Sequence, residues 1–241
     1  MPVNCQKLEG RGPVFSDPAN DKEYWMIDND QEPIVRPYVL LPSGNVIDLV
    51  DPSPMSWSNN DLAVGLSRTY RWGGHSAWKN PLSVAQHCLT VLAIRELDGP
   101  LSPELALYEL VHDAEEGLIG WDCVYPLKQF LGAPFAQLCA RLTARIAERY
   151  KLPALTTEER RLHKLADRRA AASEALHVVR WSPEQISTTL NIADEPLGRD
   201  PLIYGIDRGT YVAWEPWTSE YAAAEWLSRF TLELARAGVW S

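Results

Sequence analysis

The sequence lacks the features that mark membrane, secreted and disulfide-stabilised proteins. No apolar run approaches the roughly 20 residues that span a bilayer, so we expect no contact with a membrane. The first residues, MPVNCQKLEGRGPVFSDPAND, contain no apolar core of the kind found in secretory signals, and we expect a cytoplasmic protein. Only four of the 241 residues are cysteine and none forms a C-x-x-C pair, so we expect reduced thiols that are mostly buried.

Basic residues are also few. The 23 lysines and arginines stand against 32 aspartates and glutamates, which gives a formal net charge of −9. A chain this acidic lacks the broad positive field on which non-specific duplex binding depends, so nucleic acid is not expected as a partner, although a local basic groove stays open. Apolar residues make up 46% of the chain, which suffices for a core, and most of the ten tryptophans are expected in it.

Strand patterns are absent after residue 50, where one helical pattern follows another with short connections. Capping residues or Ser-Pro pairs precede most of these segments, as at Ser58, Ser83, Ser102, Thr156 and Ser182. This order favours an all-α helical bundle. The expected helices cover residues 59–70, 84–97, 103–119, 133–150, 157–179, 183–190 and about 219–238.

The N-terminal part is the exception. Residues 35–50, VRPYVLLPSGNVIDLV, form two short extended pieces around a PSGN turn, which predicts a small β-hairpin. We therefore expect an N-terminal extension with short strands (1–50), a helical core (51–195), and a C-terminal loop and helix that pack on the core (196–241). The stretch 194–217 is rich in Gly, Pro and Asp and indicates a long loop.

The most distinctive local feature is a His-Asp pair. His112 and Asp113 lie near the end of the apolar segment ALYELVHDAEEG, where adjacent residues project about 100° apart and can reach one metal ion over the helix edge. Glu116 follows at i+4 and i+3 from the pair and shares its face, so its carboxylate could carry a proton for water or a leaving oxygen. A polar cluster at a helix end is the alternative interpretation.

Two residues on other helices fit the same chemistry. His87 lies in the first turn of an apolar helix, where a hydrogen-bonded core histidine is the alternative. Asp167 lies in mid-helix among apolar residues and needs a partner, for which a neighbouring arginine is the alternative. Together with His112 and Asp113 they provide four N and O ligands, a set suited to one divalent ion such as Mn, Co, Zn, Fe or Mg.

This order of ligands resembles that of the HD-domain metal phosphohydrolases, in particular bacterial 5′-deoxynucleotidases and the phage and bacterial HD hydrolases that include phage dATP triphosphohydrolases. LSRTYRW and SVAQH resemble the family's Arg-Trp turn and first ligand histidine, and HDAEEGLIG its HD helix. DCVYPLK resembles its D-x-x-x-P-x-K loop, and LADRRAAASEAL its last-ligand helix. The resemblance covers about residues 38–180 and implies an HD-domain helical bundle around one divalent metal ion.

Carried over residue by residue, the resemblance assigns four metal ligands, which are His87, His112, Asp113 and Asp167. It assigns two catalytic acidic residues, Glu116 and Asp122. In the family a glycine usually precedes the aspartate directly, whereas in this chain Trp121 stands between Gly120 and Asp122. This insertion could displace Asp122 from the site.

The resemblance also assigns substrate contacts. Arg71 and Lys128 match residues that hold phosphate, and Trp72 matches a tryptophan beside the nucleotide. A surface arginine and a core tryptophan are the alternatives for Arg71 and Trp72. His75, in the turn RWGGHS, is a further candidate for substrate binding, with a plain turn histidine as its alternative.

Two residues near Asp167 in the sequence are not expected to belong to the metal site. His163 lies four residues before it on the same helix face, where it could support a ligand by a hydrogen bond, but a solvated position is the favoured interpretation. Glu174 lies two turns after it and is interpreted as structural.

The resemblance implies a metal-dependent phosphohydrolase that removes phosphate from (deoxy)nucleoside 5′-monophosphates. Release of triphosphate from a dNTP such as dATP is the rival within the same class, and a non-catalytic nucleotide-binding regulatory module is the rival from another class. An RNA or DNA end-processing enzyme is disfavoured by the net charge of −9. A nucleotide is thus the expected partner, and the resemblance also implies that the chain can form a homodimer.

Overall fold

The computed structural model of the chain describes residues 14–17, 22–25, 36–203 and 212–239. The chain divides into two compact units, Met1–Pro37 and Tyr38–Ser241. In the first unit the described residues form an antiparallel hairpin of β1 (Val14–Asp17) and β2 (Lys22–Trp25), in which Val14 pairs with Trp25. The sequence predicted short strands in this part of the chain but did not place this hairpin.

The second unit begins with the hairpin that the sequence predicted. Strand β3 (Tyr38–Leu40) pairs antiparallel with β4 (Val46–Asp48), and Val39 lies opposite Ile47. Gly44 makes the turn possible, because its φ of +86° lies in the left-handed region that glycine tolerates best. The side chain of Ile47 is fully buried among the helices, so the hairpin belongs with the helical unit rather than with the preceding residues.

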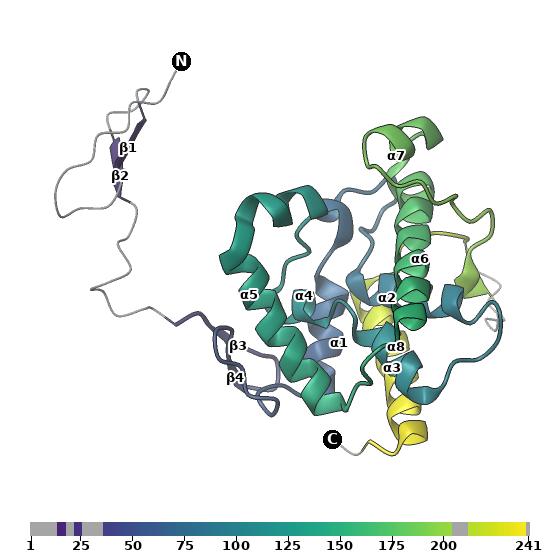
Figure 1. Ribbon diagram of the computed structural model, residues 1–241, viewed down its shortest axis with the longest axis horizontal. Helices are drawn as coiled ribbons and strands as arrows, with labels where there is room; N and C mark the ends of the chain where they lie inside the picture. The colour runs from purple at the N-terminus through teal and green to yellow at the C-terminus, as the bar shows by residue number, and fades with distance from the viewer. Residues whose placement is uncertain (1–13, 18–21, 26–35, 204–211, 240–241) are drawn as a thin grey trace. The chain divides into compact units, whose positions relative to one another are not determined.

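The rest of the described second unit is helical, and the all-α prediction is confirmed (Figure 1). The caps expected from the sequence are present: the side chains of Ser58, Ser83, Ser102, Thr156 and Ser182 each accept a hydrogen bond from a backbone N–H of the first turn. The helices are α1 (Asn59–Arg68), α2 (Val84–Arg95), α3 (Pro103–Val111), α4 (Ala114–Ile119), α5 (Tyr125–Tyr150), α6 (Thr157–Glu174), α7 (Pro183–Thr188) and α8 (Ser219–Ala237).

Packing brings the predicted site segments together. Helix α1 packs against α4 and α8, and α2 packs against α3, α6 and α8, so the helices that carry the candidate ligands surround α2. The core between them includes the fully buried side chains of Trp57, Tyr150, Trp226 and Phe230. The Trp57 indole N–H donates to the Tyr150 hydroxyl (3.1 Å), which satisfies a polar group that would otherwise be buried without a partner.

The expected single helix over residues 103–119 is wrong, because the structure breaks it at the His-Asp pair. Helix α3 ends at Val111, and α4 starts at Ala114. Asp113 leaves the helical region with φ −113° and ψ 25°, and its carbonyl accepts the N–H of Glu116 instead of continuing the helix. The break redirects α4, whose Gly117 meets Gly65 of α1 in a close backbone contact.

Other helix boundaries differ less. Helix α5 begins at Tyr125 rather than at Ala133, and Gly132, with φ +70° and ψ −154°, separates the added segment from the predicted helix. After α6 a π-helical turn, η2 (Ala175–Val179), completes the run predicted to residue 179. Among the described residues, no helix combines the length and apolarity of a membrane span.

The expected thiols and the expected loop over 194–217 lie only partly within the described residues. Cys88 and Cys123 are buried and Cys139 is half-buried, all as free thiols, whereas Cys5 lies outside the described residues. The stretch 194–217 contains one short helical turn, η3 (Pro201–Ile203), and its residues 204–211 lie outside the described part of the chain.

Candidate metal centre

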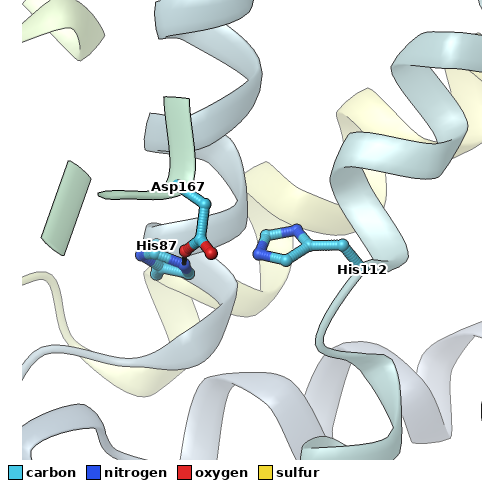
Figure 2. Close-up of side chains that lie close together, drawn as sticks. All are labelled: His87, His112 and Asp167. Atoms are coloured by element: carbon cyan, nitrogen blue, oxygen red, sulfur yellow. Dashed lines mark ion pairs between the residues drawn. The ribbon is translucent and has the colours of Figure 1, made fainter. Parts of the chain in front are cut away.

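Three helices position the predicted ligands. His87 lies in the first turn of α2, just after the Ser83 cap, and is fully buried. His112 is the residue that ends α3, and Asp113 directly precedes α4, so the break between these helices sets the direction of both side chains. Asp167 lies in the middle of α6. Residues from distant parts of the sequence therefore meet where α2, α6 and the α3–α4 junction come together (Figure 2).

The four predicted ligands converge. His87 Nε2 lies 3.4 Å from Asp167 Oδ1 and 3.6 Å from Asp113 Oδ2. His112 Nε2 lies 3.3 Å from Asp113 Oδ2. Ligand atoms of His87, His112 and Asp167 all lie within 4.8 Å of one another, and Figure 2 shows the carboxylate of Asp167 between the two imidazole rings. This group could hold a metal ion, and Asp113 borders it.

The hydrogen bonds of the two histidines leave the same ring nitrogen available. His87 Nδ1–H donates to Glu174 Oε1 at 2.6 Å, and His112 Nδ1–H donates to the carbonyl oxygen of Glu109 at 2.8 Å. Both Nε2 atoms are buried, and neither has a hydrogen-bond partner among the described residues. Buried polar atoms are rarely left in this state without a functional reason. A neutral imidazole oriented through Nδ1 with a bare Nε2 is the form that binds metal ions.

The electrostatics of the metal group favour positive charge. Burial opposes protonation of His112, yet the neighbouring carboxylate of Asp113 raises the pKa of this histidine well above its usual value. Burial likewise opposes ionisation of Asp167, but the imidazole of His87, 3.4 Å away, lowers the pKa of this carboxyl below its usual range. A site that stabilises a proton among two carboxylates and two imidazoles is also suited to a divalent cation.

Glu116 lies beside this group with an altered acidity. Burial and the charges of Asp113 and Asp122 raise the pKa of Glu116 to about 8. Its Oε1 accepts a hydrogen bond from Lys128 Nζ at 2.7 Å, and its Oε2 is buried without a hydrogen-bond partner among the described residues. The carboxyl group can therefore take up and release a proton near neutral pH, which is what a general acid or base requires.

Arg71 and Trp72 reach the site from the short helical turn η1 (Arg71–Gly74). Arg71 Nη1 lies 3.7 Å from Asp113 Oδ2, so the guanidinium borders the candidate ligands rather than the open surface. Trp72 has a left-handed backbone, with φ +59°, and its indole N–H donates to Glu174 Oε2 at 3.3 Å. Arg71 thus lies beside a candidate ligand, and Trp72 contacts the carboxylate that holds His87.

Asp122 lies beside Arg71 although Trp121 stands between it and Gly120. Gly120 ends α4 in the left-handed conformation, and the N–H of Trp121 bonds back to the carbonyl of Glu116. This turn leaves the Trp121 side chain 43% exposed and directs Asp122 inward, where it is only 9% exposed. Asp122 Oδ2 lies 4.0 Å from Arg71 Nη1. His75, in contrast, is exposed, and it is not part of the group of ligand atoms found among the described residues.

The solvated position expected for His163 is wrong. The ring is buried, its Nδ1–H donates to Glu109 Oε2 at 2.7 Å, and it packs edge-on against His112 with 5.0 Å between ring centroids. Its position one turn before Asp167 was the available signal. Glu174, for which the sequence indicates only a structural role, contacts His87, Arg71 and Trp72. The seven-residue spacing from Asp167, which places both carboxylates on one helix face, was the signal there.

Comparison with other proteins gives a family but no activity. The chain matches no protein-family model. It is 33% identical over 171 residues to an uncharacterized protein of Rhodobacter capsulatus, in an alignment that covers 70% of this chain and 83% of that protein. At this identity and coverage the two proteins share a common fold and ancestry. The chain therefore belongs to the same protein family as this Rhodobacter capsulatus protein.

Proposed function

We propose that the chain is a metal-dependent phosphohydrolase of the HD-domain type that removes phosphate from (deoxy)nucleoside 5′-monophosphates. The observation that carries the proposal is the pair of buried imidazole Nε2 atoms that face two carboxylates and have no hydrogen-bond partner among the described residues. The order of these residues along the chain, which resembles that of HD-domain enzymes, supports the same function.

His87, His112, Asp113 and Asp167 would hold the ion. Two imidazoles and two carboxylates suit Mn, Co, Zn, Fe or Mg. A divalent cation bound there would neutralise charge on phosphoryl oxygens and increase the acidity of water. The chain supplies at most four ligands in this arrangement. An ion that takes more than four ligands would therefore keep positions open for water and phosphate.

The remaining residues would act directly on the substrate and on protons. Arg71 offers a planar guanidinium beside the ligand group, and such a group can hold two phosphate oxygens at once, which lysine cannot. Glu116, with its pKa raised to about 8, can exchange a proton with attacking water or the leaving oxygen. Lys128 fixes the orientation of that carboxyl through its hydrogen bond to Oε1.

Phosphate release tests this proposal. The purified chain is incubated with Mn²⁺, Co²⁺, Zn²⁺ or Mg²⁺ and with dNMPs, NMPs, dNTPs and cyclic nucleotides. We expect metal-dependent release of orthophosphate from monophosphates, and loss of this release in the H112A/D113A double variant and in D167N. The matched control is D194N, because Asp194 pairs with Arg168 outside the site, and this variant should keep wild-type activity.

Other outcomes would replace the proposal. Release of triphosphate from dNTPs, with no release from monophosphates, would make the chain a dNTP triphosphohydrolase that uses the same residues. Tight nucleotide binding without turnover under any metal would favour a regulatory module. Activity that survives in H112A/D113A would contradict the site itself.

A further inference from the structure

A buried carboxylate behind the candidate metal group joins residues that the proposed reaction uses separately. Glu174 is the last residue of α6, and its side chain is 2% exposed. It lies seven residues after Asp167, so both carboxylates project from the same face of one helix. Asp167 faces the imidazole of His87 from the side of Nε2, whereas Glu174 contacts the same ring from the side of Nδ1.

The two oxygens of Glu174 have different partners. Oε1 accepts the Nδ1–H of His87 at 2.6 Å. Oε2 accepts the Nε–H of Arg71 at 2.8 Å and the indole N–H of Trp72 at 3.3 Å. A carboxylate can only accept hydrogen bonds, so this contact keeps the proton of His87 on Nδ1 and leaves the lone pair on Nε2. The contact to Arg71 occupies Nε, which leaves the outer nitrogens of the guanidinium to face the site.

We infer that Glu174 is a positioning residue that holds His87 in its metal-binding tautomer and Arg71 in its phosphate-binding orientation at the same time. The inference rests on the proposed function, because it concerns the metal ligand and the phosphate contact of that reaction. His112 has no comparable side-chain partner at Nδ1, since it donates to a backbone carbonyl. A single substitution at Glu174 should therefore disturb both metal binding and phosphate binding without removing a ligand.

A purely structural role makes a different prediction, and the chain offers a matched comparison. Glu233 of α8 is also fully buried, and it accepts hydrogen bonds from Arg229 and Arg236. Its partners belong to α8 and not to the metal group. Substitution of either glutamate by glutamine removes a buried charge beside arginine, so both variants should lose stability. Only the change at Glu174 should alter metal and phosphate binding.

The test compares E174Q, E174D and E233Q with the wild type. Binding of Mn²⁺ is measured by calorimetry, and kcat and KM are measured with a dNMP. A glutamine cannot accept from both His87 and Arg71 through two oxygens, so E174Q should bind Mn²⁺ about 10–100-fold more weakly, as is typical for lost partners of ligating histidines. It should also raise KM and lower kcat. E174D keeps the charge and should recover part of both losses.

The outcomes separate this inference from the proposed function. The inference is overturned if E174Q binds Mn²⁺ and dNMP within twofold of the wild type, whatever its stability, or if E233Q weakens Mn²⁺ binding as much as E174Q. Should E174Q fail to fold, E174D decides alone, and wild-type Mn²⁺ affinity in that variant overturns the inference. Absence of both Mn²⁺ binding and phosphatase activity in the wild type would instead overturn the proposed function, and the inference with it.

Discussion

The contact between α1 and α4 is so close that a single methyl group should disturb it. A Cβ atom added at Gly65 would overlap the carbonyl oxygen of Gly117 and would stand 2.9 Å from its carbonyl carbon. A Cβ added at Gly117 would stand 2.9 Å from the backbone nitrogen of Leu66. At Gly65 the three nearest obstructing atoms all belong to the backbone of Gly117, which cannot rotate away as a side chain can. The substitution G65A must therefore push the two helices apart.

The size of the effect follows from two opposing terms. Alanine in place of glycine inside a helix stabilises by about 1 kcal/mol. Overpacking a close contact costs about 1–3 kcal/mol, and a backbone clash belongs at the upper end of that range. The net loss is then about 2 kcal/mol, which corresponds to a fall in Tm of about 4–8 °C for a unit of this size. Because α4 follows Asp113 directly and carries Glu116, activity should fall as well.

Urea unfolding and thermal scans of G65A measure this effect. The matched control is G198A, since a Cβ at Gly198 meets no atom within 4 Å and its φ lies outside the left-handed region. This control should be neutral or slightly stabilising, because alanine reduces the conformational entropy of the unfolded chain. Unchanged or higher stability of G65A would refute the reasoning about the helix contact.

Three further predictions concern other contacts. Burial opposes ionisation of Asp61, but hydrogen bonds from Ser58 and Ser43 outweigh burial and lower the pKa of this carboxyl below its usual value of 3.8. The variant D61N should therefore lose about 2 kcal/mol of stability at pH 7 in urea unfolding. This difference from the wild type should shrink as the pH falls through the lowered pKa, and a difference that grows on acidification would contradict the assignment. Y150F leaves the buried indole N–H of Trp57 without its acceptor and should cost about 1–3 kcal/mol by the same assay, so an unchanged midpoint would argue against this bond. R71K loses one charge-assisted hydrogen bond to phosphate, about 1.5–3 kcal/mol, and should raise KM for a dNMP about tenfold or more, while an unchanged KM would remove this residue from the substrate site.

Local signals in the sequence predicted much of the fold. Helix starts at Ser58, Ser102 and Thr156 follow from capping, because a cap depends only on residues within one turn. The β3–β4 hairpin follows from the turn that contains Gly44. The metal group follows from residue types on separate helices, which predict His87, His112, Asp113 and Asp167 together. Three of these, His87, His112 and Asp167, have ligand atoms within 4.8 Å of one another.

Features that depend on tertiary packing could not be predicted in this way. The break at Asp113 interrupts a segment whose apolar pattern is continuous, and it accompanies a close contact of Gly117 with α1 that no local pattern reveals. The buried position of His163 depends on Glu109, which is 54 residues away in the chain. The contacts of Glu174 depend on η1 and α2 meeting at the end of α6.

The most direct test of the central claim is the location of a bound ion. Crystals grown with Zn²⁺ would be measured at the zinc absorption edge, and the anomalous difference map would be calculated. We expect one peak per chain, about 2.1 Å from Nε2 of both His87 and His112 and within bonding distance of Asp167. No peak at these nitrogens, or zinc bound only elsewhere on the chain, would contradict the metal centre and the phosphohydrolase proposed on it.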